Sequence, residues 1–210
     1  MASQYLPTGT VYGVLLNFSA EHAALAAHMS QPPYNAPPKA PVLYIKTANT
    51  FSANGASVPL PKNVPQVEIS ATIAMVIGPA TRYVLMNDLS IPHTSYFRPP
   101  VKFKCLDGFL GVGSQLVAVD DPANVKLEIR INGNLRQTVD FANLVRDSKT
   151  LLNDVNDFMT LREGDVLMLG CDCLPGGGRP LAKAGDVIHI SSPSHPALGV
   201  LVNMLIADTL

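Results

Sequence analysis

The sequence predicts an α+β fold dominated by strands, arranged as a mixed sheet that rolls up or closes into a barrel, with few short helices. Segments of strand-forming composition outnumber those with helical periodicity, and the two kinds do not alternate in the βαβ rhythm of a parallel sheet. The chain has 210 residues, 47% of them hydrophobic, which is enough for one sizeable core. We therefore expect a single domain over residues 1–210, with residues 1–8 as an N-terminal extension.

The first part of the chain combines strands with one helix and one proline-rich segment. Residues 19–29 are rich in alanine and leucine and carry an acidic first turn, which predicts a short helix with Ser19 as its N-cap. Residues 30–41 contain five prolines, which exclude regular structure and predict a surface loop or lid. Strands are predicted in the ranges 8–17, 42–46 and 67–78.

The second part is predicted to hold a hairpin, a helix and further strands. Residues 125–131 and 135–141 are strand-like and flank an Asn-Gly-Asn turn. Residues 148–161 carry leucines at helical spacing, with Ser148 as the expected cap. Further strands are predicted in the ranges 116–119, 165–170, 186–190 and 198–205. The glycine run 176–178 is followed by no Lys-Ser/Thr pair, so a flexible turn is favoured over a phosphate-binding loop.

Charge and hydropathy exclude several classes of partner. The net charge is −1 with 15 Lys plus Arg and no basic block, so nucleic acid and anionic membranes are not expected as partners. No apolar run reaches the roughly 18 residues that span a bilayer, and the N-terminus lacks the pattern of a signal peptide. We therefore expect a cytoplasmic protein.

The three cysteines, Cys105, Cys171 and Cys173, are an odd number. The spacing of Cys171 and Cys173, with one residue between them, matches neither the zinc-knuckle nor the redox pattern. Free buried thiols are the favoured interpretation, and a metal or redox role is the alternative.

Two neighbouring stretches concentrate polar side chains. On the predicted strand 67–78, Glu68, Ser70 and Thr72 fall on one face. The proline-containing segment 87–109 adds a larger set of charged or titratable residues: Asp88, His93, Arg98, Lys102, Lys104 and Asp107. Several cations beside a carboxylate at a strand end would suit a substrate with several carboxylates, because Arg and Lys bind such groups by charge-assisted hydrogen bonds. A solvated surface loop is the alternative.

The order of several segments resembles the fumarylacetoacetate hydrolase family. The segments are VLYIKTANT, VEISATIAMVIG, VLMNDLS, KFKCLDGF and GDVLMLG. Two more, QPPYNAPPKAPV and YFRPPVKFKCLDGF, resemble the branch that degrades homoprotocatechuate (4-hydroxyphenylacetate). The resemblance implies a subunit of a 5-oxopent-3-ene-1,2,5-tricarboxylate decarboxylase and 2-hydroxyhepta-2,4-diene-1,7-dioate isomerase. It also implies a polycarboxylate 2-oxo acid substrate and a same-fold partner subunit in a homo- or heterodimer.

The resemblance further implies a divalent metal, Mg²⁺, Mn²⁺ or Ca²⁺, held by a Glu-x-Glu pair and one aspartate. Counting back from Gly78, the two glutamate positions fall on Ser70 and Thr72, and Asp88 matches the aspartate. Glu68 would become a ligand only if the strand register shifted by two residues. Because affinity for a hard cation depends on the charge of its ligands, we expect a degenerate metal site.

Other site residues follow from the same resemblance. Lys104 matches a lysine of the family and is the expected catalytic residue, and Lys46 matches an earlier lysine. Lys46, Arg98, Lys102 and Asp107 are the expected substrate-binding residues, although Asp107 before a glycine also suits a plain turn.

Two departures from the family pattern bear on the alternatives. The family's His and Glu, one helical turn apart, are not matched here, because His22 falls one place late and Leu25 stands where the glutamate would follow it. Their absence counts against a carbon–carbon hydrolase, because that reaction needs an activated water. A non-catalytic scaffold or ligand-binding subunit is the other alternative. In addition, only residues 79–86 stand where the family has an amphipathic helix, and we expect a segment missing from the sequence rather than a true deletion, because deletion would expose apolar surface.

Overall fold

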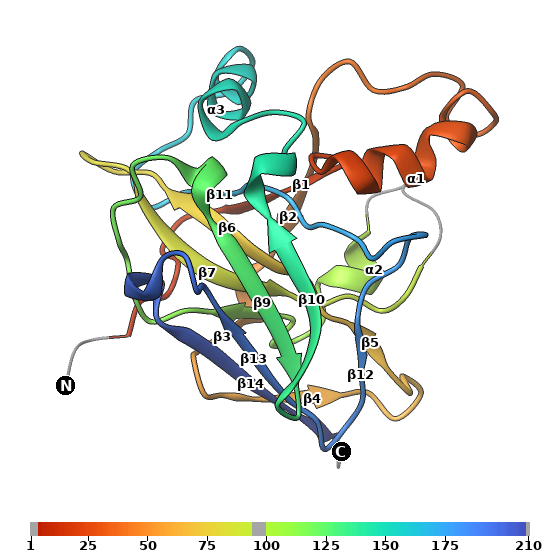
Figure 1. Cartoon of the computed structure of the whole chain (residues 1–210), viewed down its shortest axis with the longest axis vertical. Helices are drawn as coiled ribbons and strands as arrows, with labels where there is room; N and C mark the ends of the chain where they lie inside the picture. The colour runs from red at the N-terminus through yellow and green to blue at the C-terminus, as the bar shows by residue number, and fades with distance from the viewer. Residues whose placement is uncertain (1–3, 94–99, 209–210) are drawn as a thin grey trace.

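Two large sheets pack against each other in the computed structural model, which describes residues 4–93 and 100–208 (Figure 1). The strands are β1 (Val11–Leu15), β2 (Val42–Lys46), β3 (Phe51–Ser52), β4 (Ser57–Leu60), β5 (Val67–Glu68), β6 (Ala71–Val76), β7 (Arg82–Asp88), β8 (Leu110–Val112), β9 (Lys126–Ile131), β10 (Asn134–Asp140), β11 (Val166–Met168), β12 (Leu181–Ala182), β13 (Val187–Ser191) and β14 (Val200–Ala207). The helices are α1 (Ser19–Met29), α2 (Val101–Lys104) and α3 (Ser148–Asn156). The β-dominated α+β class is confirmed; that residues 1–210 form one domain stays a prediction.

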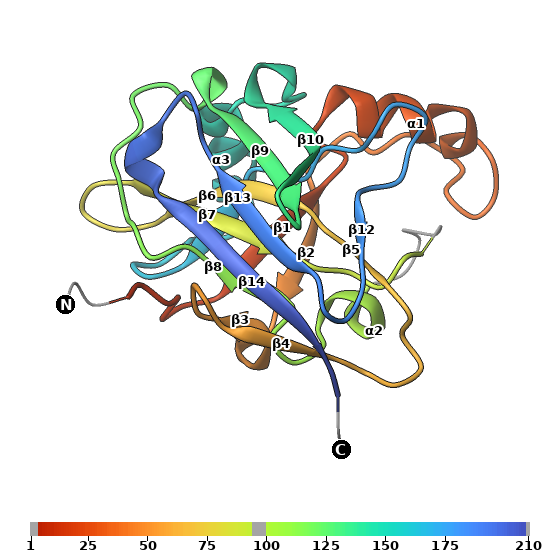
Figure 2. The same cartoon turned by 60° about the horizontal axis from the view of Figure 1, so that its bottom comes forward.

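The larger sheet is mixed, as the sequence predicts. Its seven strands follow the order β2-β1-β11-β6-β7-β8-β3, with β1 parallel to β11 and β3 parallel to β8. The smaller sheet has the order β10-β9-β13-β14-β4, and β12 pairs with β5 as a separate ladder. Figure 2 shows β14 and β13 crossing in front of the larger sheet, with α1 at one end of the molecule.

The main core lies between the two sheets. Ile73 of β6 and Leu85 of β7 are fully buried in one cluster with Ile129 of β9 and Ile190 of β13. Their neighbours in sequence point to the opposite face, where a second buried cluster gathers, including Ala74. Because β6 and β7 are buried on both faces, their sequences read as nearly continuous apolar runs.

The α1 helix has its predicted range, whereas α3 begins at the predicted Ser148 but ends at Asn156 rather than at residue 161, and the caps of both helices differ from the prediction. Phe18 precedes α1 without a side-chain cap, and the Ser19 hydroxyl instead donates to the Asn143 carbonyl at 2.9 Å. Asp147, rather than Ser148, caps α3 by accepting from the Thr150 amide at 2.7 Å. The predicted Ser19 and Ser148 caps are therefore wrong. A hydroxyl one residue inside the helix does not occupy the extended N-cap conformation, which belongs to the residue before it.

The predicted strand 67–78 is two strands in different sheets. Glu68 pairs with Leu181 of β12 and makes an isolated bridge to Ser90. The next amide, that of Ile69, donates to the Pro180 carbonyl at 2.8 Å, before β6 joins the larger sheet at Ala71. The prediction of a single strand is wrong because the backbone groups of residues 67–69 bond to β12, Pro180 and Ser90, whereas those of β6 bond to the larger sheet.

Two smaller predictions also need correction. Residues 116–119 form no strand; Val117 makes only an isolated bridge to Tyr83. The β6–β7 hairpin closes at the pair Val76 and Arg82, so the connection needs no additional helix. The expectation of a missing segment is therefore wrong for this fold. In the remainder of the turn, the Ile77 amide donates to the Asp165 carbonyl at 2.8 Å.

In the proline-containing segment 87–109, the described residues 87–93 and 100–109 form no long helix, and α2 is one short turn after Pro100. Across the described ranges, no helix combines the length and apolar character needed to cross a membrane. The cytoplasmic location stays a prediction.

Candidate functional site

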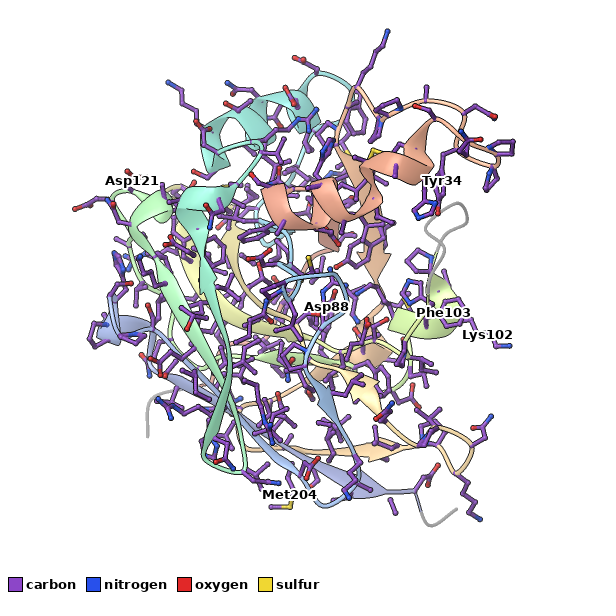
Figure 3. The ribbon with its side chains drawn as sticks, turned by 45° about the vertical axis from the view of Figure 1, so that its right-hand side comes forward. Tyr34, Asp88, Lys102, Phe103, Asp121 and Met204 are labelled. Carbon is purple, nitrogen blue, oxygen red and sulfur yellow. The ribbon has the colours of Figure 1, made fainter. Side chains whose placement is uncertain are left out.

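Asp88 is the centre of a buried ionic cluster at the end of β7. Its side chain has no solvent exposure, and Figure 3 shows it inside the molecule. The Lys104 Nζ donates to Asp88 Oδ2 at 2.7 Å, and the Lys46 Nζ lies 2.9 Å from Oδ1. The Tyr44 hydroxyl also donates to Oδ2. Each oxygen of this carboxylate therefore has an ammonium neighbour.

Three elements bring these partners together. Tyr44 and Lys46 are two positions apart on β2 and share one face. Lys104 ends α2, and its carbonyl, like that of Phe109, accepts a hydrogen bond from the Lys46 ammonium. The cluster thus fixes α2 to the larger sheet through side chains and backbone together.

A glycine on β1 makes room for the Tyr44 ring. Gly13 pairs with Tyr44 across β1 and β2, and a Cβ at Gly13 would lie 2.1 Å from the ring atom Cζ. The Tyr44 ring therefore lies directly over the β1 backbone, and its hydroxyl reaches Asp88. Any larger side chain at this position would displace it.

The electrostatics of the cluster follow from burial and proximity. Burial favours the neutral form of Asp88, but the charges of Lys104 and Lys46 outweigh it and lower the pKa of this carboxyl well below its usual range. Burial lowers the pKa of Lys46, and the charge of Asp88 opposes that shift. Burial and the nearby Asp88 charge raise the pKa of the Cys171 thiol to about 12, so it is protonated at neutral pH.

The residues around Asp88 do not fit a divalent cation. Ser70 and Thr72, where the family resemblance implies two glutamates, are neutral and buried. The Ser70 hydroxyl has no hydrogen-bond partner among the described residues, and the Thr72 hydroxyl donates to a carbonyl at 3.1 Å. Both oxygens of the Asp88 carboxylate form ion pairs with ammonium groups, those of Lys46 and Lys104. Among residues 4–93 and 100–208, no three His, Cys, Asp or Glu side chains are grouped so as to hold a metal.

A second charged group lies beside a cavity of about 440 Å³. Arg179 is buried; its Nη2 donates to Glu21 Oε1 at 2.5 Å, and its Nη1 lies 3.8 Å from Glu68 Oε2. Glu21, Glu68 and Arg179 all line the cavity, together with His28, His93 and the glycine run 176–178. Burial raises the pKa of Glu68, which the charges of Arg179 and Lys104 oppose. Burial lowers the pKa of His93.

Sequence reasoning missed Arg179 and the role of Glu21. Glu21 on α1 is buried, and its second oxygen accepts from the Leu16 amide at 2.6 Å. Its partner Arg179 stands 158 positions later in the sequence, so no local pattern connects the two. The available signal was an arginine directly after the glycine run, close to the end of a predicted loop.

The other predicted site residues lie outside this centre. Lys102 is exposed and points away from Asp88 at the edge of the molecule (Figure 3). Asp107 is exposed at a turn and accepts from Asn49 Nδ2 at 2.6 Å, as expected for a turn residue. Arg98 lies outside the described residues. Substrate binding by these three residues and by Lys46, and catalysis by Lys104, stay predictions.

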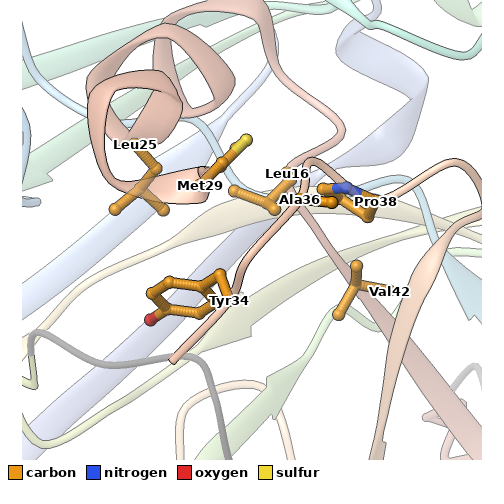
Figure 4. Close-up of a pocket in the computed structure, with 7 residues that line it drawn as sticks. All are labelled: Leu16, Leu25, Met29, Tyr34, Ala36, Pro38 and Val42. Atoms are coloured by element: carbon orange, nitrogen blue, oxygen red, sulfur yellow. The ribbon is translucent and has the colours of Figure 1, made fainter. Parts of the chain in front are cut away.

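A smaller cavity of about 180 Å³ also lies beside α1 (Figure 4). It is lined mostly by apolar side chains from α1, the proline-rich segment and β2: Leu16, Leu25, Met29, Tyr34, Ala36, Pro38 and Val42. Leu25 lines both cavities. The proline-rich segment thus covers an apolar pocket next to the charged one, in keeping with its prediction as a loop or lid.

The three cysteines are free thiols, as predicted, and two of them, Cys171 and Cys173, are buried.

Comparison with known proteins gives consistent results. The family model "Fumarylacetoacetate (FAA) hydrolase C-terminal" matches residues 10–206. The chain is 34% identical to the 4-hydroxyphenylacetate degradation bifunctional isomerase/decarboxylase of Salmonella dublin, over 90% of this chain and 46% of that protein. It is 32% identical to the homoprotocatechuate catabolism bifunctional isomerase/decarboxylase of Escherichia coli, over the same shares. The chain therefore spans about half the length of these relatives.

Solved structures share the fold. A 5-carboxymethyl-2-hydroxymuconate delta-isomerase from Mycobacterium smegmatis superposes with a TM-score of 0.76 at 23% identity, covering 98% of this chain and 79% of that one. A 2-hydroxyhepta-2,4-diene-1,7-dioate isomerase from Mycobacterium marinum gives a TM-score of 0.73 at 20% identity, covering 99% and 78%. With the family match over nearly its whole length, the chain belongs to the fumarylacetoacetate hydrolase family.

Proposed function

We propose that this chain is a subunit of an isomerase/decarboxylase that acts on an unsaturated polycarboxylate in 4-hydroxyphenylacetate (homoprotocatechuate) catabolism. The observation that carries the proposal is the match to the bifunctional isomerase/decarboxylases, which covers 90% of this chain but 46% of the relative. We propose that this chain pairs with a second subunit of the same fold. That subunit would correspond to the half of the longer relative that this chain does not match.

The metal-dependent chemistry is assigned to the partner subunit. In this chain the two glutamate positions hold Ser70 and Thr72, and Asp88 is bound by Lys46 and Lys104. These residues hold β2, β7 and α2 together through the ion pairs of Asp88. The cavity lined by Glu68 and Arg179 is the place we propose for the substrate. Glu68 and Arg179 of that cavity are the groups placed to contact a substrate.

Carbon–carbon hydrolysis is the less favoured activity for this chain. A hydrolase of that kind needs a base that removes a proton from water. Glu21, the acidic residue nearest the expected position, has both oxygens engaged, one by Arg179 and the other by the Leu16 amide. Because both of its oxygens already accept hydrogen bonds, the Glu21 carboxylate is suited to position Arg179 and not to remove a proton from water.

The test is a reconstitution assay. The chain is freed of metal and assayed with oxaloacetate and with the 4-hydroxyphenylacetate-pathway intermediate, alone and mixed with a same-fold partner with an intact Glu-x-Glu pair, with and without Mg²⁺ or Mn²⁺. We expect turnover only in the mixture, and only with metal. The partner alone is the control, and it should show no turnover until this chain is added.

Two other results would contradict the proposal. Binding to the partner without any change in turnover would make this chain a scaffold. Metal-dependent turnover by the chain alone would show a complete site within it, contrary to the arrangement around Asp88.

A further inference from the structure

The outer face of the smaller sheet carries a row of apolar side chains on β14. Val200, Met204 and Ile206 are 49%, 45% and 39% exposed, and Val202 in the same row is half-buried. All four point away from the core, because the residues that alternate with them along the strand are buried or belong to its end. The face of an antiparallel sheet that meets water is usually polar. This row, the β14 stripe, departs from that pattern.

No helix of the described residues covers the β14 stripe. In Figure 2, β13 and β14 lie toward the viewer, and none of α1, α2 and α3 crosses in front of them. Single apolar side chains on a surface are normal, whereas a contiguous row of them marks an interaction surface. The stripe therefore predicts a protein partner.

The face around the stripe is large enough for a dimer contact. Five strands form it, in the order β10-β9-β13-β14-β4, and they are about six residues long on average. With a strand spacing of about 4.8 Å and a rise of about 3.3 Å per residue, the face covers roughly 500 Å². Two such faces in contact would bury about 1,000 Å², which is near the lower limit for a specific interface.

Two charged side chains beside the stripe are arranged so that they can pair with a second copy. Glu128 and Arg130 point outward on β9 and lie 2.8 Å apart. The strand pairing through β13 places Glu128 in one row with Val200, and Arg130 in the next row with Val202. The two rows are about 6.6 Å apart. Neighbouring rows thus carry opposite charges on β9 and apolar side chains on β14.

We propose that this chain forms a two-fold dimer in which the outer face of the smaller sheet packs on the same face of a second copy. The two-fold axis runs across the strands, between the Glu128 row and the Arg130 row. Each Arg130 then faces Glu128 of the second copy. Each Val200 likewise faces Val202 of the second copy. A two-fold contact is self-complementary in this way, and sheets commonly pack face to face about 10 Å apart.

The charge pattern selects this axis over one that runs along the strands. An axis along the central strand β13 would lay β9 over β14 of the second copy. Glu128 and Arg130 would then be buried against the β14 stripe with no charged group of the second copy to meet them, which is unfavourable. None of the residues of the proposed contact lines the 440 Å³ cavity, so the inference does not depend on the proposed function.

The test measures self-association of the full chain by gel filtration with light scattering and by sedimentation equilibrium. At micromolar concentration we expect wild type to have twice the 22.4 kDa of one chain. Val200→Asp should raise the dimer Kd about 100-fold or more, because it buries an unpaired charge near the axis. The matched control is Val145→Asp, at a side chain 45% exposed outside this face, which should stay dimeric.

Charge reversal tests the position of the axis. Glu128→Arg and Arg130→Glu should each raise the dimer Kd about 10-fold or more, because like charges then face each other across the contact. Mixing the two variants should restore dimers, because every charge then faces an opposite one. Arg82→Glu, which reverses an exposed charge on β7, is the control and should leave the dimer Kd unchanged.

A wild-type chain that is monomeric at high micromolar concentration would overturn the inference. So would a dimer that survives Val200→Asp, or a mixture of the two charge variants that stays monomeric. A monomeric wild type that binds the same-fold partner subunit, and loses that binding in Val200→Asp, would assign the face to that subunit instead of a second copy. These results leave the proposed function standing, because the reconstitution assay measures turnover. An intact dimer without turnover in the reconstituted mixture would count against the proposed function alone.

Discussion

At the scale of single residues, the Asp88 carboxylate is the anion that pairs with two buried ammonium groups, those of Lys46 and Lys104. Lys46 and Lys104 are 1% and 2% exposed, so neither is compensated by water. Removing the charge of Asp88 leaves both ammonium groups uncompensated. We predict that Asp88→Asn lowers the free energy of unfolding by about 3–5 kcal/mol, measured by urea denaturation.

The matched control is Asp154→Asn. Asp154 pairs with Arg146 at 2.8 Å, but its side chain is 34% exposed. We expect this control to lose less than about 1 kcal/mol. An Asp88→Asn variant as stable as the control would show that the cluster contributes nothing to the fold.

The lowered pKa of Asp88 also predicts a pH dependence. The folded pKa lies below the unfolded value of 3.8, so the charge of Asp88 stabilises the fold fully above that value. The contribution is lost as the pH falls through the folded pKa. We predict that the Asp88 carboxyl stays ionised at pH 3, measured from its carbon chemical shift by NMR. Protonation of Asp88 at its ordinary pKa would contradict this.

At the scale of elements, the pairing of β1 with β2 positions the site. The Tyr44 ring lies over Gly13, where a methyl group would come within 2.1 Å of it. We predict that Gly13→Ala destabilises the protein by about 1–3 kcal/mol through overpacking and shifts the NMR signals of Tyr44.

Gly78→Ala is the control for this effect. Gly78 lies in the β6–β7 turn, and the nearest atom to an added Cβ is 3.8 Å away. This variant should be as stable as wild type within about 0.5 kcal/mol. Equal stability of the two variants would mean that the ring moves aside without cost.

At the scale of the whole molecule, two ammonium groups stand beside Asp88 where the family resemblance implies a divalent ion. We predict that the melting temperature of the isolated chain is the same, within about 1 °C, in EDTA and in millimolar Mg²⁺, Mn²⁺ or Ca²⁺. A specific ion at 100 times its Kd would add about 2.7 kcal/mol of stability and raise the melting temperature. A saturable rise that disappears in Asp88→Asn would contradict the prediction.

Much of this architecture could be predicted from the sequence because it depends on local periodicity. The α1 range matches the predicted 19–29, and β9 and β10 form the predicted hairpin around the Asn-Gly turn. The sequence alone also shows neutral residues, Ser70 and Thr72, at the positions where the family resemblance implies two glutamates. The break of the predicted strand near Glu68 could not be predicted from the sequence. The backbone of Glu68 pairs with β12 and with Ser90, which are distant in sequence.

The sequence alone predicts the β-dominated class, the order of the main elements, and neutral residues at the positions where the family resemblance implies two glutamates. The packing of distant segments sets which charges meet: Lys46 and Lys104 pair with Asp88, and Arg179 lies between Glu21 and Glu68. Side-chain periodicity is a local property that follows from backbone geometry. Ion pairing in a buried site depends instead on distance and desolvation, which are set only when segments far apart in the chain pack together.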